Sequence, residues 1–284
     1  MGIAIDSKAV RRGIRLAVLG VLATLLVYAF WLEPSSLRAI MHPIDLPNPA
    51  ARPLRGLRIA VIADLHAGAS YIDEAKIDAV VRLANAAKPD LTLIAGDLVA
   101  HGTFALRSIP AAVIAAHLKP LRAPLGVYAV LGNHDHWDDA AAIATSLRSA
   151  GIRVLINQAI PLRFRGRPLA LVGIDDPVTG HDDVGKALKD VSPASPALCL
   201  AHTPDIFPTL PAICALTIAG HTHGGQVSLP VLGRLIVPSK YGQRYAAGLI
   251  CEARKCLFVS TGIGTSIIPV RFRVPPEVSI LELS

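Results

Sequence analysis

The chain has 284 residues, of which 52% are apolar and 17% charged, so it can bury one large core or two small ones and is not intrinsically disordered. Its net charge of +7 is spread out, with no basic run that interleaves aromatic residues, which favours an anionic membrane surface over nucleic acid as a partner. The four cysteines form no C-x-x-C motif and do not cluster with histidines, which disfavours a zinc finger.

The first predicted element is an apolar helix near the N-terminus. Residues 16–32 carry no charge, and a helix of that length spans about 25 Å, at the short end for a bilayer crossing that Ile14 can extend. The residues that precede the run are basic: Lys8, Arg11, Arg12 and Arg15. By the positive-inside rule, we predict a cytoplasmic arm over residues 1–13, a single transmembrane helix over residues 14–32 and a periplasmic location for the rest of the chain.

Two other interpretations of this segment compete. Arg11-Arg12 before an apolar run loosely resembles a twin-arginine export signal, and Val27-Tyr28-Ala29 offers a small-residue cleavage site. A buried core helix is the third interpretation, and the lack of any polar face disfavours it. Prolines then recur between positions 34 and 53, which predicts an extended linker over residues 33–55.

Residues 56–284 are predicted to form the globular domain. Its first apolar run, at residues 57–63, fits a strand in a sheet that is covered on both faces. Helical periodicity over residues 73–87 and a second apolar run at residues 91–95 then indicate a strand–helix–strand unit with parallel strands, and so the α/β class. The alternation continues with a helix over residues 108–118, a strand over 127–130 and a helix over 139–150.

The second half of the domain is predicted to contain mainly short strands. Residues 154–173 fit such strands with a turn at 165–167, and residues 181–189 fit a surface helix. Further strands are predicted at residues 198–201, 216–219, 246–250, 257–260 and 278–283. Low-complexity tracts and fixed-period repeats are absent from the sequence.

The cysteines fall into two kinds by their surroundings. Cys199 and Cys214 lie in apolar runs and are predicted to be small core residues. Cys251 and Cys256 flank a four-residue polar segment, so they face each other across the ladder if that segment is a hairpin loop. We predict a disulfide between Cys251 and Cys256 in an exported domain.

Polar side chains of metal-ligand type follow successive apolar strands. The carboxyl ends of strands form the edge where ligands bind in open α/β sheets. Each group alone fits a turn or a helix cap, but eight such groups at strand ends are hard to explain that way: Asp64, His66, Asp97, Asn133, His134, His202, His221 and His223. The remaining histidines are predicted to be structural: His42, His101, His117, His136 and His181.

The spacing within these motifs also predicts how they bind. Asp64 and His66 are two residues apart, so on extended chain they point the same way and can hold one ion. His221 and His223 repeat this spacing. Asp97 ends the strand next to that of Asp64, and two bare carboxylates at one edge would repel each other, which favours a metal between them.

The order of these motifs resembles that of the calcineurin-like metallophosphoesterase family, from about Leu57 to the C-terminus. The motifs that carry the resemblance are Asp64-x-His66, Gly96-Asp97, Gly132-Asn133-His134-Asp135, His202 and Gly220-His221-x-His223. Further motifs are similar to those of the membrane-associated YkuE/YaeI-type branch: His202-x-Pro204-Asp205, Gly224-Gly225-Gln226, Gly262-x-Gly264 and Pro269-x-Arg271-Phe272-x-x-Pro275-Pro276-Glu277.

The resemblance implies a four-layer sandwich of two mixed sheets flanked by helices, with two divalent ions at one end. Manganese, iron or zinc suits this mixed set of nitrogen and oxygen ligands. The first ion would take Asp64, His66, Asp97 and His223. The second would take Asp97, Asn133, His202 and His221. The ions would activate a shared water for attack on phosphorus, and His134, assisted by Asp135, would act on the leaving oxygen.

One position departs from the family pattern. Family members often have Gly-Asp-x-x-Asp, and the second aspartate orients the histidine that corresponds to His134. This chain has Ala100 there. A backbone carbonyl or Asp135 is therefore predicted to hold His134 instead.

The predicted function is hydrolysis of a phosphodiester or pyrophosphate bond in a membrane-derived, lipid-linked substrate. This prediction rests on the combination of a predicted anchor helix with a full set of predicted metal ligands. A soluble nucleotide or cyclic nucleotide is the alternative substrate, and a metal-bearing scaffold without turnover is an alternative of another class. No nucleic-acid partner is expected.

Overall fold

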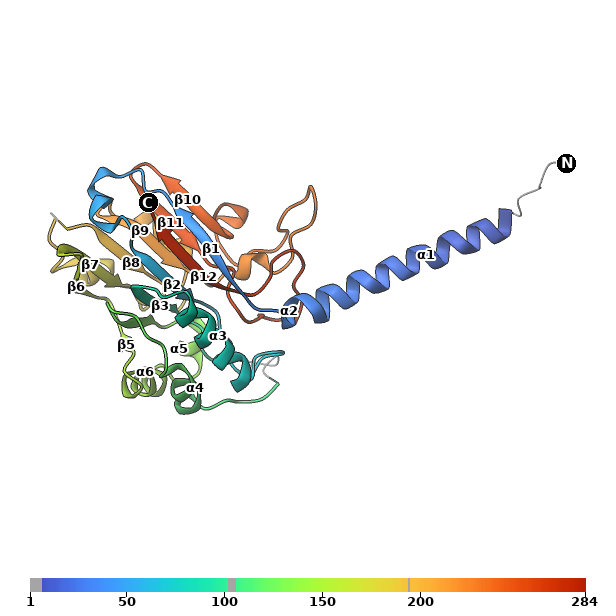
Figure 1. Cartoon of the computed structure of the whole chain (residues 1–284), viewed down its shortest axis with the longest axis horizontal. Helices are drawn as coiled ribbons and strands as arrows, with labels where there is room; N and C mark the ends of the chain where they lie inside the picture. The colour runs from blue at the N-terminus through green and yellow to red at the C-terminus, as the bar shows by residue number, and fades with distance from the viewer. Residues whose placement is uncertain (1–6, 102–105, 194) are drawn as a thin grey trace.

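Two six-stranded sheets form the body of the domain (Figure 1). The computed structural model describes residues 7–101, 106–193 and 195–284. All neighbouring strands of the first sheet are parallel except β12 and β2, which are antiparallel. Its strand order is β1 (Arg38–Ile44), β12 (Glu277–Leu283), β2 (Arg58–Ile62), β3 (Leu91–Ala95), β4 (Val127–Val130) and β5 (Arg153–Val154).

The second sheet is also mixed. Its antiparallel pairs are β10 with β11 and β7 with β6, while the pairs between them are parallel. Its strand order is β10 (Gly248–Glu252), β11 (Lys255–Val259), β9 (Cys214–Ala219), β8 (Ala197–Leu200), β7 (Arg167–Gly173) and β6 (Gln158–Phe164). Two mixed sheets flanked by helices confirm the predicted fold class.

The core lies mainly between the two sheets. Ile59 and Leu93 from the first sheet and Leu198 and Leu216 from the second are fully buried there. Each such side chain contributes about 1.5–3 kcal/mol relative to an exposed one. Because both faces of the central strands are covered, these strands are continuous apolar runs, which made them recognisable in the sequence.

Helices form the two outer layers. The outer face of the first sheet packs against α3 (Glu74–Ala86), α4 (Ala111–Leu118) and α6 (Ala140–Ser149). The second sheet is covered more thinly, by α7 (Val184–Leu188) and the 3-10 helix η3 (Pro204–Thr209). The helix predicted over residues 181–189 is thus shorter, because the Asp183 side chain caps it by accepting a bond from the Lys186 N–H.

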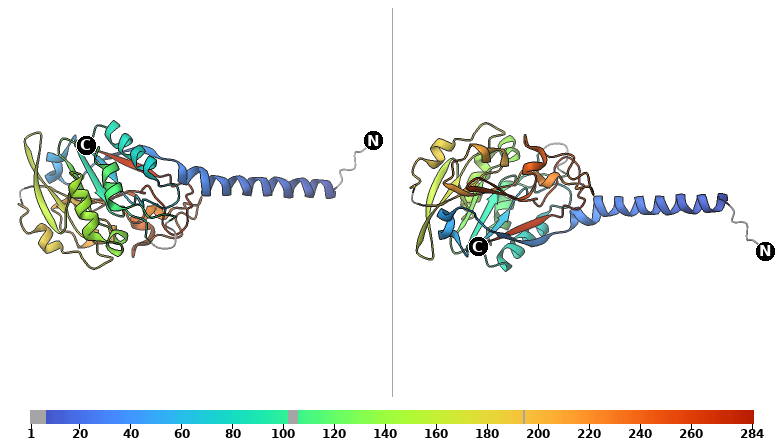
Figure 2. Two further views of the ribbon diagram at one scale, coloured as in Figure 1. Left: turned by 90° about the horizontal axis from the view of Figure 1, so that it is seen from below. Right: turned by 90° about the horizontal axis from the view of Figure 1, so that it is seen from above.

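The N-terminal segment is one helical rod that projects from the domain (Figures 1 and 2). It consists of α1 (Ser7–Val27), the π-helical segment η1 (Tyr28–Leu32) and α2 (Glu33–Ser35). The segment Lys8–Ser35 is long and apolar enough to cross a membrane, and only 6% of its apolar stretch is buried against the domain. The buried-core interpretation of this helix is therefore wrong.

The prediction of an extended linker over residues 33–55 is also wrong. β1 pairs with β12 along its whole length, and the 3-10 helix η2 (Pro49–Leu54) follows it. Proline is compatible with β1 because this strand lies at the sheet edge, where a missing backbone N–H leaves no gap in the ladder. Glu33 is folded in as well, since its buried carboxylate accepts the backbone N–H groups of Arg273 and Val274 at 2.8 and 2.6 Å.

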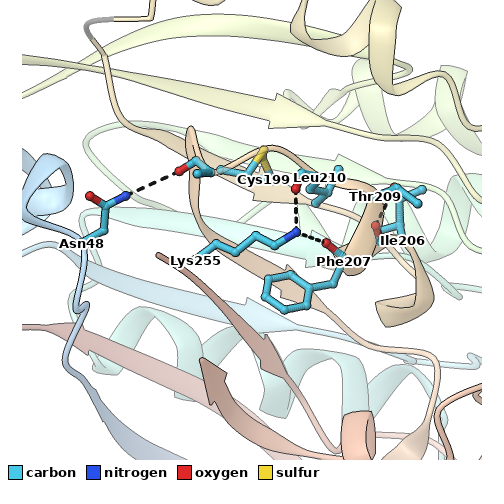
Figure 3. Close-up of a disulfide and its surroundings, with 9 residues drawn as sticks. Asn48, Cys199, Ile206, Phe207, Thr209, Leu210 and Lys255 are labelled. Atoms are coloured by element: carbon cyan, nitrogen blue, oxygen red, sulfur yellow. Dashed lines mark hydrogen bonds between the residues drawn. A yellow bond between two sulfur atoms is a disulfide. The ribbon is translucent and has the colours of Figure 1, made fainter. Parts of the chain in front are cut away.

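Two disulfides join neighbouring strands of the second sheet. The predicted bond between Cys251 and Cys256 is confirmed, because these residues lie opposite each other in the β10–β11 hairpin, with an S–S distance of 2.06 Å. Cys199 and Cys214 are buried as predicted, but they also form a disulfide, which the sequence analysis missed. Beside it, the Lys255 ammonium group donates to backbone carbonyls of η3 and the residue that follows (Figure 3).

Candidate metal centre

The predicted ligands converge at one edge of the two sheets. The parallel strands β2, β3 and β4 of one sheet and β8 and β9 of the other all end at this edge. Asp64 and His66 follow β2, Asp97 follows β3, Asn133 and His134 follow β4, His202 follows β8, and His221 and His223 follow β9. All eight side chains are buried or half-buried.

One group of ligand atoms forms around His66. Its Nε2 atom lies 3.1 Å from Nε2 of His223 and 3.5 Å from Oδ2 of Asp97. Nε2 of His223 in turn lies 3.7 Å from Oδ1 of Asp64. These four residues are the set that the sequence analysis assigned to the first ion.

A second group forms around His202. Its Nε2 atom lies 3.2 Å from Oδ2 of Asp97, 3.1 Å from Oδ1 of Asn133 and 3.1 Å from Nδ1 of His221. These are the four residues assigned to the second ion. Oδ2 of Asp97 stands between the two groups, as a shared ligand would.

The distances between these atoms fit metal coordination. Two ligand atoms that each lie about 2.1 Å from one ion are roughly 3.0–3.4 Å apart at octahedral or tetrahedral angles. Most of the separations above fall close to this range. In addition, Oδ2 of Asp64 is buried and has no hydrogen-bond partner in the described part of the chain, so a cation would satisfy it.

The backbone conformation explains how the ligands converge. Five of them have left-handed φ angles, at Asp64 (52°), His66 (46°), Asp97 (54°), His221 (71°) and His223 (50°). For residues other than glycine, this conformation is strained and persists where the surrounding structure demands it. Asp64 and His66 do lie in one group, but because of these φ angles and not because the chain is extended there.

The same spacing argument is wrong for the second pair of histidines. His221 and His223 do not point together: His223 joins Asp64 and His66, whereas His221 joins Asp97 and His202. This division of the two histidines is the one that the resemblance implied, which did not depend on extended chain.

Glycines that precede the ligands leave room for them. A Cβ atom added to Gly132 would lie 2.2 Å from Oδ1 of Asp97, and one added to Gly220 would lie 2.6 Å from Oδ2 of Asp64. Any side chain at these positions would displace a ligand carboxylate. The glycine in each motif is thus part of the ligand geometry and not only a turn former.

Backbone carbonyls orient two of the imidazoles. Nδ1 of His202 lies 2.7 Å from the Ala95 carbonyl oxygen, and Nδ1 of His223 lies 3.3 Å from that of Gly264. A carbonyl only accepts, so each Nδ1 carries the proton and each Nε2 faces the centre. The buried Arg271 guanidinium also donates to the Gly264 carbonyl and so holds it in place. The sequence analysis quoted Arg271 only as part of a motif and assigned it no role.

The electrostatics of the centre favour a bound cation. Burial raises the pKa of Asp64 to about 7 and lowers the pKa of His66 to about 3. His202 behaves differently: although burial opposes its charge, the Asp97 carboxylate raises its pKa to about 10. A positive charge is thus stabilised beside Asp97 even without a metal, and a divalent ion would take the place of that proton.

His134 lies beside both groups, and aromatic rings surround it. Its ring centroid is 4.7 Å from that of His66, 5.0 Å from Trp137 and 6.4 Å from His101. Its backbone N–H donates to Oδ1 of Asp97 at 2.9 Å. Three rings thus pack around His134, while its Nδ1 atom has no hydrogen-bond partner among the described residues. The sequence analysis missed Trp137 and counted His101 as structural, because neither belongs to a ligand motif.

Asp135 does not hold His134, so this one of the two predicted alternatives is wrong. Its buried carboxylate accepts backbone N–H groups from Gly132 at 3.0 Å and from Leu98 and Val99 at 2.9 and 3.3 Å. It therefore joins the turn that carries His134 to the loop that carries Asp97. Burial raises the pKa of Asp135 to about 7. Its geometry is that of a positioning residue and not of an acid or base.

Comparisons with known proteins agree with this site. The model of the calcineurin-like phosphoesterase family matches residues 57–225. The uncharacterized metallophosphoesterase YkuE of Bacillus subtilis is 31% identical over 90% of this chain and 88% of its own length. Phosphodiesterase YaeI of Escherichia coli is 32% identical over 90% and 92%, respectively. A transmembrane protein with metallophosphoesterase domain from Bos taurus is 30% identical over 88% of this chain and 57% of its own.

Proposed function

This chain belongs to the calcineurin-like phosphoesterase family, a family of metal-dependent phosphoric ester hydrolases, and from this membership we propose that it cleaves a phosphodiester or pyrophosphate bond in a lipid-linked substrate at a membrane surface. One observation carries the proposal. The apolar helix α1 projects from one end of the domain (Figure 1), and hydrogen bonds at its base join it to the loops around the candidate metal ligands. A membrane around α1 would therefore lie next to the reacting groups.

The contacts at the base of the helix place it beside these loops. The Tyr71 hydroxyl, in the loop after β2 that begins with Asp64, donates to the Phe30 carbonyl at 2.6 Å. The Arg271 N–H, close to the Gly264 carbonyl that orients His223, donates to the Ala29 carbonyl at 2.9 Å. The helix is thus bonded to the loops that surround the candidate ligands.

We propose that the centre holds two divalent ions, of manganese, iron or zinc. Asp64, His66, Asp97 and His223 would hold the first, and Asp97, Asn133, His202 and His221 the second. When bound, such ions supply Lewis acidity toward phosphoryl oxygens and make a nearby water more acidic. The buried carboxylates and the Nε2 atoms that face inward fit this role.

Stabilisation of the leaving oxygen is assigned to a side chain of the protein, His134. Burial lowers the pKa of His134, which makes its protonated ring a stronger acid toward a leaving oxygen. Its Nδ1 atom is buried without a partner in the part of the chain that the structure describes. We propose that His134 donates a hydrogen bond or proton to the leaving oxygen, while Asp97 fixes its backbone and Trp137 its ring.

We propose that α1 is an uncleaved anchor with its N-terminus in the cytoplasm and the domain outside it. The basic residues before the apolar run support this orientation. Two disulfides support an oxidising compartment. Cleavage at Val27-Tyr28-Ala29 would cut the helix inside its contact with the domain, because Ala29 is buried and its carbonyl bonds to Arg271.

A fusion of alkaline phosphatase to the C-terminus should be active, because that enzyme folds only where its disulfides form. The same fusion made with green fluorescent protein is the matched control and should be dark. Intact mass after alkylation without reductant should show no modified thiol, since all four cysteines are paired. If the green fluorescent protein fusion is fluorescent and the phosphatase fusion is inactive, the domain lies in the cytoplasm.

Substrate class is tested on the full chain in lipid vesicles with manganese. The comparison uses two esters with the same scissile phosphodiester, one linked to a diacyl lipid and one to a short soluble alcohol. We expect kcat/KM to be higher for the lipid-linked ester by roughly tenfold or more, because remote binding energy then contributes to the transition state. Equal values, or a preference for nucleotides, would favour the soluble-substrate alternative.

A further inference from the structure

Two loops beside the base of the N-terminal helix expose large apolar side chains. In the first, Val231 is fully exposed and Ile236 is 81% exposed; in the second, Ile267 and Ile268 are 66% and 49% exposed. Leu232 and Leu235 add to the first loop. We call residues 231–236 and 267–268 the apolar loops. Side chains of this size gathered at one end of a domain indicate an interaction site.

The backbone at the loop tips is strained in the same way. Val231 has a φ of 69° and Ile267 a φ of 64°, although β-branched residues strongly disfavour this region. Each is the centre of a three-residue turn, closed by the Leu232 N–H to Pro230 at 2.8 Å and by the Ile268 N–H to Ser266 at 2.7 Å. Glycine or asparagine would relieve this strain, so the structure presents apolar side chains at a local cost.

Both loops are tied to the segment that carries His223. In the first loop, the Arg234 side chain donates to the Gly224 carbonyl at 2.7 Å, and Gln226 ties the second. The Gln226 side chain accepts the Ser266 N–H at 2.6 Å and donates to the Ile268 and Val270 carbonyls at 3.0 and 3.2 Å. Its backbone N–H donates to the carbonyl of the ligand His223 at 3.0 Å. The loops therefore hold a fixed position relative to the ligands.

The segment that follows the second apolar loop contacts the base of the helix. The ring of Phe272 packs edge-on against that of Tyr28, with centroids 6.1 Å apart, and Glu33 binds the two residues that follow. In every view the loops lie at the end of the domain from which α1 projects (Figures 1 and 2). A bilayer that surrounds α1 thus meets these loops first.

We propose that the apolar loops insert into the outer layer of the bilayer and hold the metal centre against the membrane surface. Exposed basic residues suit the phosphate layer just outside: Lys240 follows the first loop and Arg273 follows the second. The occupant is the lipid bilayer, because α1 brings it to this face and no other. The inference rests on the proposed anchoring role of α1 and deepens it by naming the surface through which lipid-linked substrate reaches the centre.

The test measures depth in the membrane, independently of activity. The native cysteines are all paired, so Ile236→Cys and Ile268→Cys can each carry one fluorescent probe on the full chain. Met41→Cys, at 48% exposure on the edge strand β1, is the matched control, and Arg167→Cys, at the start of β7 and so at the opposite edge, is the distant one. The proteins are placed in vesicles of phosphatidylethanolamine and phosphatidylglycerol that contain a spin-labelled lipid quencher.

Probes at positions 236 and 268 should be quenched several-fold more strongly than probes at positions 41 and 167. Equal, weak quenching at all four positions would overturn the proposal. An apolar emission spectrum at positions 236 and 268 without lipid quenching would also overturn it, by showing that a second copy or another protein covers the loops.

A kinetic comparison separates this inference from the proposed function. The double variant Ile236→Asn/Ile268→Asn should keep its metal content and its kcat/KM on a small soluble diester, while its rate on the lipid-linked ester falls by roughly tenfold. If the probes at positions 236 and 268 are quenched strongly but the protein does not hydrolyse lipid-linked esters, the proposed substrate is refuted and the docking surface is still supported. Activity on lipid-linked esters that the double variant retains in full would refute the docking surface alone.

Discussion

Asp97→Asn should lower metal content, stability in manganese and turnover together. Its Oδ2 atom lies 3.5 Å from Nε2 of His66 and 3.2 Å from Nε2 of His202, so it is the one carboxylate oxygen that both groups share. The substitution removes that negative charge from between two proposed dications. The loss of metal affinity should exceed the roughly 100-fold that is typical when an outer-shell partner is lost.

The measurement pairs metal analysis with thermal unfolding, with and without manganese. At about 100 times Kd, a bound ion stabilises the wild-type chain by about 2.7 kcal/mol, and Asp97→Asn should lose most of this gain. Asp135→Asn is the matched control, since it is a buried carboxylate nearby that bonds only to backbone N–H groups. It should destabilise the chain with and without manganese alike. A full manganese gain in Asp97→Asn would rule out the shared-ligand role.

His134→Gln should leave metal bound while turnover on an alkyl ester falls by roughly 10²–10⁴. The substitution removes a donor to the leaving oxygen and no assigned ligand. The loss should shrink on a nitrophenyl ester, because that leaving group needs no proton. Rates on both esters, measured beside metal content, test the assignment.

His117→Gln is the matched control for this variant. The His117 side chain bonds to the carboxylate of Asp78 at 2.7 Å and lies on α4, in the outer helical layer. It should leave both rates and the metal content unchanged. Loss of metal in His134→Gln would make His134 a ligand, which its position beside His66 and Asp97 permits. Full activity on the alkyl ester would assign the proton to another residue.

The sequence predicted the sheets and the location of the site well, because both depend on local patterns. Strands covered on both faces are continuous apolar runs, and the polar residues that end them must meet at one edge once the strands are parallel. Asp64, Asp97 and Asn133 were placed by this rule alone. The pairing of histidines across the two sheets needed the resemblance, because it depends on how the sheets face each other.

What the sequence could not predict depends on contacts between distant segments. The strand β1 was taken for linker because prolines mask its pattern, and only its pairing with β12 defines it. The disulfide between Cys199 and Cys214 follows from the adjacency of β8 and β9. Asp135 was misassigned because its partners, the N–H groups of Leu98 and Val99, belong to the preceding strand's loop.

The junction between α1 and the domain is folded, so it would fix the distance between a membrane around α1 and the candidate metal centre. If residues 33–55 were flexible, the metal centre could range over roughly 25 Å from the membrane. Instead, β1 pairs within the first sheet and Glu33 bonds to the backbone of Arg273, so in a chain that α1 anchors as proposed, the fold would set the height of the candidate metal centre above the bilayer. The enzyme would then select substrates by the distance between their acyl chains and the bond to be cleaved. It would meet these substrates by diffusion within the plane of the membrane.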